Sequence, residues 1–423
     1  MEQVIVSAFL ALFAAQFIVE FGLNELNLRY VAAAIARSAI PEVFRGKIDP
    51  ESYRRSVEYT LVNGRFHRWS DIYSSTILLI VLFSGFLGFF DQWSEQLTSR
   101  LSLNSYGHGI VFCFGIGLLL TLTSLPTELY STFGIEAKFG FNKTTLALYL
   151  SDKLKALVLS ALLGVPFLFV VLWLMDIMGW SWWLWAFAFI AAFQLLMIVI
   201  FPTFIAPWFN KFEPLKESEL RERILALADQ VGFKTSGIFS MDGSRRSAHS
   251  NAYFTGIGKS KRIVLFDTLI QQMTTAQGLA VLAHEMGHYK LKHIRRMLLV
   301  QMICLFAGLY VLSLLVASPW FFAAFDLAPS NHGALVLFSL VSGPFTFYLA
   351  PLMNFLSRKH EYEADRFAAL TLREGKPMEE ALINLTVKNL SNLTPHPWYS
   401  AYHYSHPTCV ERISAIRQIA PAG

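Results

Sequence analysis

The sequence has little charge for its length. Only 15% of its 423 residues are Asp, Glu, Lys or Arg, whereas 54% are hydrophobic and 15% are aromatic. This balance excludes an ordinary soluble domain and indicates an integral membrane protein. Cysteine is also scarce: Cys113, Cys304 and Cys409 have the spacing of neither a metal site nor a disulfide framework.

No Lys or Arg precedes the first apolar run, MEQVIVSAFLALFAAQF. The basic segment that opens a cleaved signal peptide is therefore missing. We expect residues 4–22 to be a retained first membrane span, with a removed signal peptide as the alternative.

Apolar residues gather in stretches about long enough to cross a hydrocarbon core as helices. Seven such stretches lie at residues 4–22, 72–90, 109–125, 154–176, 181–204, 297–318 and 334–355. They predict an all-α polytopic membrane protein with about seven transmembrane helices.

Positive charge is nearly absent from every second connection between these spans. Arg100 is the only Lys or Arg after the second, fourth and sixth spans. Because loops rich in Lys and Arg stay in the cytoplasm, the N-terminus should be outside and the C-terminus cytoplasmic. The net charge of +5 then reflects topology and attraction to the anionic lipid bilayer, and requires no nucleic-acid partner.

The spans divide the chain into four regions. Residues 1–204 hold the first five transmembrane helices, and residues 297–355 hold the sixth and seventh. Residues 205–296 and 356–423 are long enough to form cytoplasmic bodies.

The first of these bodies has the pattern of a small α+β region. Residues 212–233 predict an amphipathic helix that Gly232 ends. Its apolar stripe consists of Leu220, Ile224, Leu227, Ala228 and Val231. Short strands are predicted at residues 237–241, 252–256 and 262–266. Thr274 and Gln277 then form a capping box that starts another helix.

That helix carries the stretch VLAHEMGHYKLKH, residues 281–293. His284 and His288 are four positions apart, so both imidazoles project from one face and can reach one zinc ion. Glu285 is placed to take a proton from a water molecule at the metal. This is the pattern of a zinc metallopeptidase, and a histidine pair on an ordinary amphipathic helix is the alternative.

Catalytic zinc normally keeps three protein ligands and one open position, so a third ligand is expected elsewhere. It does not follow directly in the sequence. Leu291 and Ile294 stand where a metzincin has its glycine and third histidine, and we expect His293 to face another way.

The stretch SRKHEYEADRFAAL, residues 357–370, offers the missing ligand. Glu361 and Asp365 share a helix face, whereas Glu363 points elsewhere. We assign Glu361 to zinc and Asp365 to the imidazole N–H of a ligating histidine. A solvated acidic face at a helix start is the alternative.

Taken together, these segments resemble the CAAX prenyl protease 1 (type I) family of integral-membrane zinc metallopeptidases. The stretches that carry the resemblance are LPTELYSTFGIEAKFGFNKTT (125–145), FNKFEPLKESEL (209–220), GSRRSAHSNAYFTGIGKSKRIVLFDTL (243–269), LAHEMGHYKLKH (282–293), SRKHEYEADRFA (357–368) and YHYSHPTCVERI (402–413). The resemblance implies seven helices enclosing a chamber, a small cytoplasmic metallopeptidase region, and one zinc ion held by His284, His288 and Glu361.

The resemblance also implies roles for three further residues. Asn251 would contact the substrate backbone along an edge strand. His406 would donate to the oxyanion, and Arg412 would brace Glu361 or the substrate. Spacing alone would make Asn251 a turn residue and the other two a turn and a surface ion pair. His360 stands where relatives tend to have an aromatic residue, and we expect it to be a bystander.

The predicted function is a zinc metalloendopeptidase. Glu285 would deprotonate the attacking water and return the proton to the leaving amine. In eukaryotic relatives the reaction removes three C-terminal residues after a prenylated cysteine, so the expected partner is a peptide or protein substrate that could be prenylated. A quality-control protease for membrane proteins is the alternative.

Two other classes remain open. An intramembrane-cleaving protease would bury its motif in lipid, which is costly beside Lys290, Lys292, Arg295 and Arg296. A channel or transporter with a structural zinc would leave Glu285 unexplained. The terminal RQIAPAG carries no retrieval signal and the outer loops are short, so we expect the bacterial inner membrane in preference to the endoplasmic reticulum. We also expect a monomer.

Overall fold

A computed structural model describes residues 1–36, 40–256 and 261–419. Residues 257–260 of the stretch 243–269, and the last four residues of the predicted cytoplasmic tail, lie outside the described residues.

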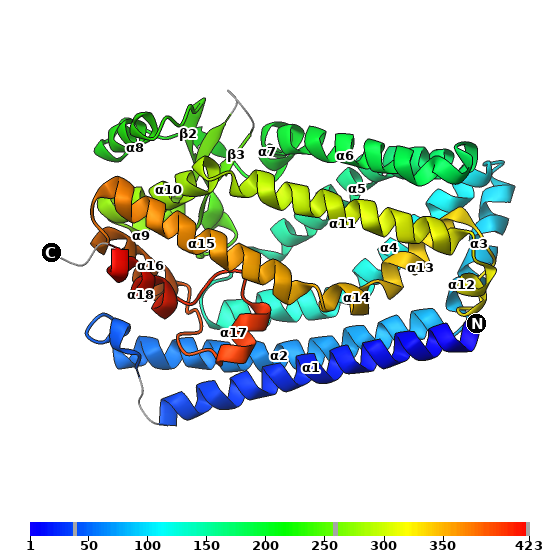
Figure 1. Cartoon of the computed structure of the whole chain (residues 1–423), viewed down its shortest axis with the longest axis horizontal. Helices are drawn as coiled ribbons and strands as arrows, with labels where there is room; N and C mark the ends of the chain where they lie inside the picture. Colours follow the sequence, from blue (N-terminus) through cyan, green and yellow to red (C-terminus); the bar gives the residue numbers. More distant parts are fainter. Residues whose placement is uncertain (37–39, 257–260, 420–423) are drawn as a thin grey trace.

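The described chain is mostly helical, and its long helices run side by side (Figure 1). Five helical segments are long and apolar enough to cross a membrane. Their α-helices are α1 (Glu2–Ala36), α4 (Ser105–Leu129), α5 (Leu146–Ile177), α6 (Trp182–Ile200) and α11 (His293–Val316). π-Helical turns extend two of them, at Tyr130–Glu136 after α4 and at Phe201–Ile205 after α6.

A sixth candidate span is bent. The helices α2 (Pro50–Phe83) and α3 (Phe86–Arg100) meet at 64°, and only the pair together is long and apolar enough to count as a span. The predicted span 72–90 covers this bend.

The predicted seventh span, residues 334–355, is not one helix. It is divided among α13 (Asn331–Val341), α14 (Gly343–Phe347) and the start of α15 (Ala350–Leu372). Pro344 and Pro351 lie in the first turns of α14 and α15, because proline has no N–H to continue a preceding helix. Five to six candidate spans are therefore found within the described residues, and the predicted count of seven is not confirmed.

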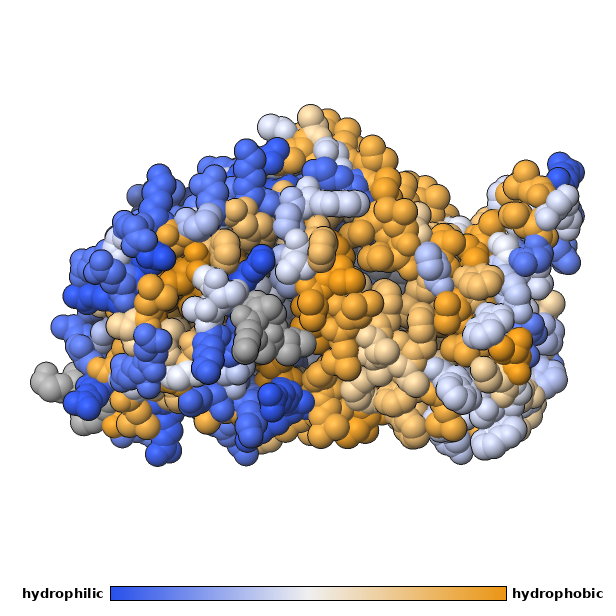
Figure 2. Space-filling model, turned by 90° about the horizontal axis from the view of Figure 1, so that it is seen from above, coloured by the Kyte–Doolittle hydropathy of each residue, from blue (hydrophilic) through white to orange (hydrophobic). Residues whose placement is uncertain are grey.

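A broad apolar surface covers the middle of the molecule, and polar side chains gather at one end (Figure 2). Four leucines of α5 each expose at least half of their surface: Leu150, Leu154, Leu157 and Leu162. Exposed apolar surface of this extent is stable only against lipid or another protein.

A four-stranded sheet lies at the polar end. Its order is β1–β2–β4–β3, in which only β2 and β4 are parallel. The strands are β1 (Phe212–Pro214), β2 (Gly237–Met241), β3 (Ala252–Thr255) and β4 (Arg262–Phe266). The three predicted strands are confirmed, and β3 is an edge strand.

The predicted helix over residues 212–233 is shorter than expected. It is α8 (Glu219–Gln230), and residues 212–214 pair as β1 instead. Pro214 disfavours a helix before it, and the Ser218 side chain accepts a hydrogen bond from the Arg221 N–H, which starts the helix there. Its predicted apolar stripe does face the core beside the sheet.

The helix α10 (Thr275–Lys290) lies at the centre of this end and packs against α8, α15 and α16 (Lys376–Lys388). The C-terminal helix α18 (Cys409–Ile419) covers α15 and α16. The shorter helices are α7 (Ala206–Phe209), α9 (Asp267–Gln272), α12 (Pro319–Ala323) and α17 (Pro397–His403).

Candidate active site

The predicted capping box starts α10. The Thr274 hydroxyl accepts a hydrogen bond from the Gln277 N–H, and the Gln277 side chain accepts one from the Thr274 N–H. Nine residues of the helix are buried, including His284. Burial on several sides holds the helix in one orientation, so its histidine face has a fixed direction.

His284, His288 and Glu361 converge between α10 and α15. The two Nε2 atoms lie 3.1 Å apart. The Glu361 carboxylate lies 3.4 Å from Nε2 of His284 and 3.2 Å from Nε2 of His288. The structure thus brings together three residues that are up to 77 positions apart in the sequence, and they could hold a metal ion.

Gly287 permits the close approach of α10 to α15. A Cβ atom at this position would lie 3.2 Å from the Cα of Ala364 and 3.2 Å from the Cβ of Phe367. Because the first of these is a backbone atom, α15 would have to move to accommodate a larger residue. Glycine at this position therefore allows Glu361 to reach the histidines.

Asp365 lies behind His284. Its Oδ1 is 2.8 Å from Nδ1 of His284, and the Arg412 guanidinium donates to both of its oxygens. Burial alone would raise the pKa of Asp365, but the hydrogen bonds from Arg412 outweigh it and hold this pKa below its usual value. The ionised carboxylate accepts the Nδ1–H of His284, so Nε2 of His284 carries a lone pair toward Glu361.

His288 is held by His293 and Glu363, two residues to which the sequence assigns no role in the site. Nδ1 of His293 lies 3.0 Å from Nδ1 of His288, and Nε2 of His293 lies 2.9 Å from Glu363. Glu363 accepts the Nε2–H of His293, so Nδ1 of His293 accepts the Nδ1–H of His288. The expectation that His293 faces away from His288 is therefore wrong, whereas Glu363 does lie outside the ligand group and contacts His293 instead.

Backbone conformation explains the error. Lys292 has a positive φ of 62° and breaks the helix between α10 and α11, which places His293 beside His288. His360 stacks on His293 with ring centroids 4.1 Å apart, so it supports this link and is not a mere bystander. The sequence signal for it was a third histidine, His293, five positions after His288.

These residues fit a metal ion. With both Nδ1 atoms occupied, the two Nε2 lone pairs face one another across 3.1 Å. Oε2 of Glu361 is buried and makes no hydrogen bond within the described part of the chain. A cation among these three atoms would satisfy all of them, and two imidazole nitrogens with one carboxylate oxygen is a known donor set for a catalytic metal with an open position.

A cavity of about 330 Å³ lies in front of this cluster. Its lining includes Glu285, Asn251, His406 and Arg412. Burial raises the pKa of the Glu285 carboxyl above its ordinary value, which suits a group that takes and returns a proton. The cavity offers space for a peptide beside a proton acceptor.

Three further predicted residues border this cavity. Asn251 directly precedes the edge strand β3. Nε2 of His406 lies 3.4 Å from Glu361, and its side chain is 63% exposed. Nη1 of Arg412 also lies 3.4 Å from Glu361, but its side chain is only 11% exposed. The Arg412 side chain is thus buried against Glu361 and Asp365, whereas the exposed His406 side chain can contact a substrate.

Two family models match the chain. Residues 30–211 match the model described as CAAX prenyl protease N-terminal, five membrane helices, and residues 214–420 match peptidase family M48. The boundary between the two matches lies at β1, where the membrane helices give way to the sheet.

Individual proteins match over nearly the whole length. A CAAX prenyl protease 1 homolog of Arabidopsis thaliana is 38% identical, covering 92% of this chain and 93% of that protein. CAAX prenyl protease 1 of Saccharomyces cerevisiae is 36% identical, covering 91% and 90%. The crystal structure of S. mikatae Ste24p has a TM-score of 0.89 at 35% identity and covers 98% of both chains.

The comparisons confirm the multi-pass membrane protein and the peptidase that the sequence predicts. These relatives are eukaryotic, so they give no support to the expected bacterial inner membrane. They also give no support to a channel or transporter. The chain therefore belongs to the CAAX prenyl protease 1 family within peptidase family M48, and it is a membrane metallopeptidase.

Proposed function

We propose that His284, His288 and Glu361 hold one zinc ion and that the enzyme cleaves peptide bonds beside Glu285. The observation that carries the proposal is the convergence of these ligand atoms at a cavity that also contains a carboxyl group outside the ligand set. The chemistry that zinc supplies when bound is polarisation of the scissile carbonyl and acidification of water.

The side chains of the site divide the remaining tasks. Glu285 accepts a proton from the attacking water and delivers it to the leaving amine, and its raised pKa favours the uptake of the proton. Asp365 and Arg412 hold His284 and Glu361 in place. His406 donates to the oxyanion as charge develops there.

An extended substrate fits beside β3. Because β3 is an edge strand within the described sheet, its outer side can pair with a peptide. Asn251 lies at the start of this strand and lines the cavity, so its side chain can bond the substrate backbone.

The relatives are named CAAX prenyl proteases. We therefore propose that this enzyme removes the C-terminal tripeptide that follows a prenylated cysteine. A second cavity of about 410 Å³ lies next to His288 and His293, and its lining includes apolar residues of α6 and α11. We assign the prenyl chain to this space, which is lined by Ile198, Ile294, Met297 and Leu298 among others.

The proposed arrangement in the membrane follows the distribution of positive charge. Residues 1–204 and 297–355 form the membrane part, which completes a seven-helix chamber if the broken α13–α15 segment crosses as the seventh span. Residues 205–296 and 356–423 form the cytoplasmic part, where a monomer carries out the reaction.

The deciding experiment is Glu285→Ala in the full-length protein. We expect peptidase activity to fall by about 10²- to 10⁴-fold, because proton transfer is lost. Zinc content, measured by mass spectrometry, should stay that of the wild type. Loss of zinc would contradict the assignment and make Glu285 a ligand.

The prenyl assignment is tested with a farnesylated peptide and the same peptide without the lipid. Ile198→Trp fills the second cavity, so we expect roughly 10-fold lower kcat/KM for the farnesylated peptide and little change for the plain one. Leu196→Trp, two positions away on the same helix and 53% exposed, is the matched control. Equal cleavage of both peptides by the wild type would favour a quality-control protease instead.

A further inference from the structure

A second cluster of ligand-type side chains lies at the opposite end of the helices from α10. Asp91 belongs to α3, His108 to the first turn of α4 and His332 to the first turn of α13. These helices lie near the N-terminus in Figure 1, away from the sheet. The catalytic reaction does not use them.

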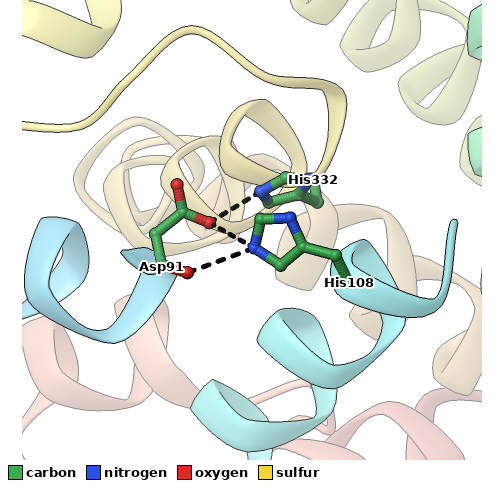
Figure 3. A group of neighbouring side chains, drawn as sticks. All are labelled: Asp91, His108 and His332. Carbon is green, nitrogen blue, oxygen red and sulfur yellow. Dashed lines mark hydrogen bonds and ion pairs between the residues drawn. The ribbon is translucent and has the colours of Figure 1, made fainter. Parts of the chain in front are cut away.

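The three side chains converge on one point (Figure 3). Oδ1 of Asp91 lies 2.8 Å from Nε2 of His332 and 3.0 Å from Nε2 of His108. Both imidazoles thus direct the same ring nitrogen at the same oxygen, and the other carboxylate oxygen points away. The ligand atoms all lie within 4.8 Å of one another, so one ion can touch all three.

Charge favours an ion over hydrogen bonds alone. Asp91 is buried, with 9% of its surface exposed. Within the described ranges its ion-pair partners are these two imidazoles, and no Lys or Arg pairs with it. A buried carboxylate that no Lys or Arg pairs with is costly. A divalent cation would supply the missing charge.

The donor set indicates which cation. Two imidazole nitrogens and one carboxylate oxygen suit zinc, at about 2.0–2.2 Å from each ligand. Tetrahedral ligands at that range lie roughly 3.4 Å apart, so the contacts of 2.8 Å and 3.0 Å need to widen by about half an ångström. We propose that Asp91, His108 and His332 bind a second zinc ion that joins α3, α4 and α13.

With three protein ligands the ion would keep one position open, but the sequence neighbours of the ligands favour a structural role. Gly107 and Gly109 flank His108, whereas Glu285 follows the first ligand of the active site. No carboxyl group therefore stands beside the histidine to move a proton. A Cβ on Gly109 would lie 3.2 Å from the Cβ of His332, so this glycine lets α13 come close to α4.

The ion would hold α3 and α13, neither of which is by itself long and apolar enough to span a membrane. Helix α3 follows the 64° bend after α2, and α13 has only 11 residues. Because each ligand comes from a different helix, binding would fix the positions of all three at that end of the molecule. Metal bound only by the folded state stabilises that state.

The test measures zinc in the purified full-length protein after loading with zinc chloride and desalting. We expect two zinc ions per chain in the wild type, one in His288→Ala and one in His332→Ala. His67→Ala, which removes an exposed histidine of α2, should keep both and is the matched control. A single zinc in the wild type, or unchanged zinc in His332→Ala, would overturn the proposal.

A second measurement covers the case in which His332→Ala does not fold. Asp91→Asn keeps the size and hydrogen-bonding ability of the side chain but removes its charge. We expect added zinc to raise the Tm of His288→Ala and to leave the Tm of the double variant Asp91→Asn, His288→Ala unmoved. If zinc shifts neither protein, the cluster is only a hydrogen-bonded link between helices.

Discussion

At the residue scale, both active-site imidazoles are fixed from behind by a hydrogen-bond acceptor. Asp365 accepts the Nδ1–H of His284, and His293, oriented by Glu363, accepts that of His288. Each link selects the tautomer that leaves Nε2 free to bind metal. Removing such a hydrogen-bond partner usually lowers metal affinity by about 10- to 100-fold.

His293→Ala should therefore weaken zinc binding by about 10- to 100-fold, because the tautomer of His288 is no longer selected. Glu363→Gln should have a smaller effect, since an amide oxygen still accepts the His293 N–H. Zinc affinity is measured by competition with a chelator.

His360→Ala is the control for this effect. It removes the ring stacked on His293 but leaves the polar link to His288 intact. A loss of zinc affinity in this variant equal to that of His293→Ala would show that packing, not tautomer selection, holds His288.

At the element scale, the contact between α10 and α15 decides whether the site exists. The first helix contributes both histidines and Glu285, and the second contributes Glu361 and Asp365. The two helices approach closely because residue 287 is glycine. A Cβ at this position would press on the backbone of Ala364. The active site therefore depends on helix packing as much as on its own residues.

Gly287→Ala should lower stability by about 1–3 kcal/mol and weaken zinc binding, because overpacking moves α15 and Glu361 away. Gly278→Ala, nine positions earlier on the same helix, is the matched control. A Cβ there would make an ordinary contact of 3.7 Å with Leu220. Alanine should stabilise α10 there by up to about 1 kcal/mol.

Thermal unfolding and zinc affinity are measured for both variants. The prediction fails if Gly287→Ala behaves as Gly278→Ala does, or if Gly287→Ala loses stability while zinc affinity stays unchanged.

At the scale of the whole molecule, the apolar surface and the distribution of Lys and Arg define the membrane position. The apolar surface covers the middle of the chain's long helices, and the sheet with α10 lies beyond one end of it (Figures 1 and 2). Arg100 lies at the end of α3, on the other side of this surface. Because connections rich in Lys and Arg are retained in the cytoplasm, this distribution supports the proposed topology, in which the C-terminus is cytoplasmic.

Labelling with a membrane-impermeant thiol reagent tests this orientation. In a variant whose three native cysteines are replaced by serine, Leu103→Cys should react from outside sealed bacterial spheroplasts that carry the protein in their inner membrane. Glu217→Cys should react only after the membrane is opened. Both positions are exposed, at 49% for Leu103 and at 80% for the Glu217 side chain, so access and not burial decides the result. The reverse pattern would contradict the proposed topology.

The sequence by itself determined the features that depend on local pattern. Apolar runs located the long helices, short runs separated by Gly, Ser and Lys located β2, β3 and β4, and the capping box located the start of α10. The i, i+4 spacing placed His284 and His288 on one face, because helix geometry depends on position alone. The resemblance of several motifs then identified the family.

Only the tertiary structure decided what depends on distant contacts. The link from His293 to His288 requires the left-handed backbone at Lys292, which no periodicity shows. The meeting of Asp91 with His332 joins residues 241 positions apart. The break of the predicted seventh span follows from prolines whose effect depends on the packing around them. Side-chain spacing along one helix is a local property, whereas the position of one helix against another depends on the whole core, and the second site and the support of the first both arise at that level.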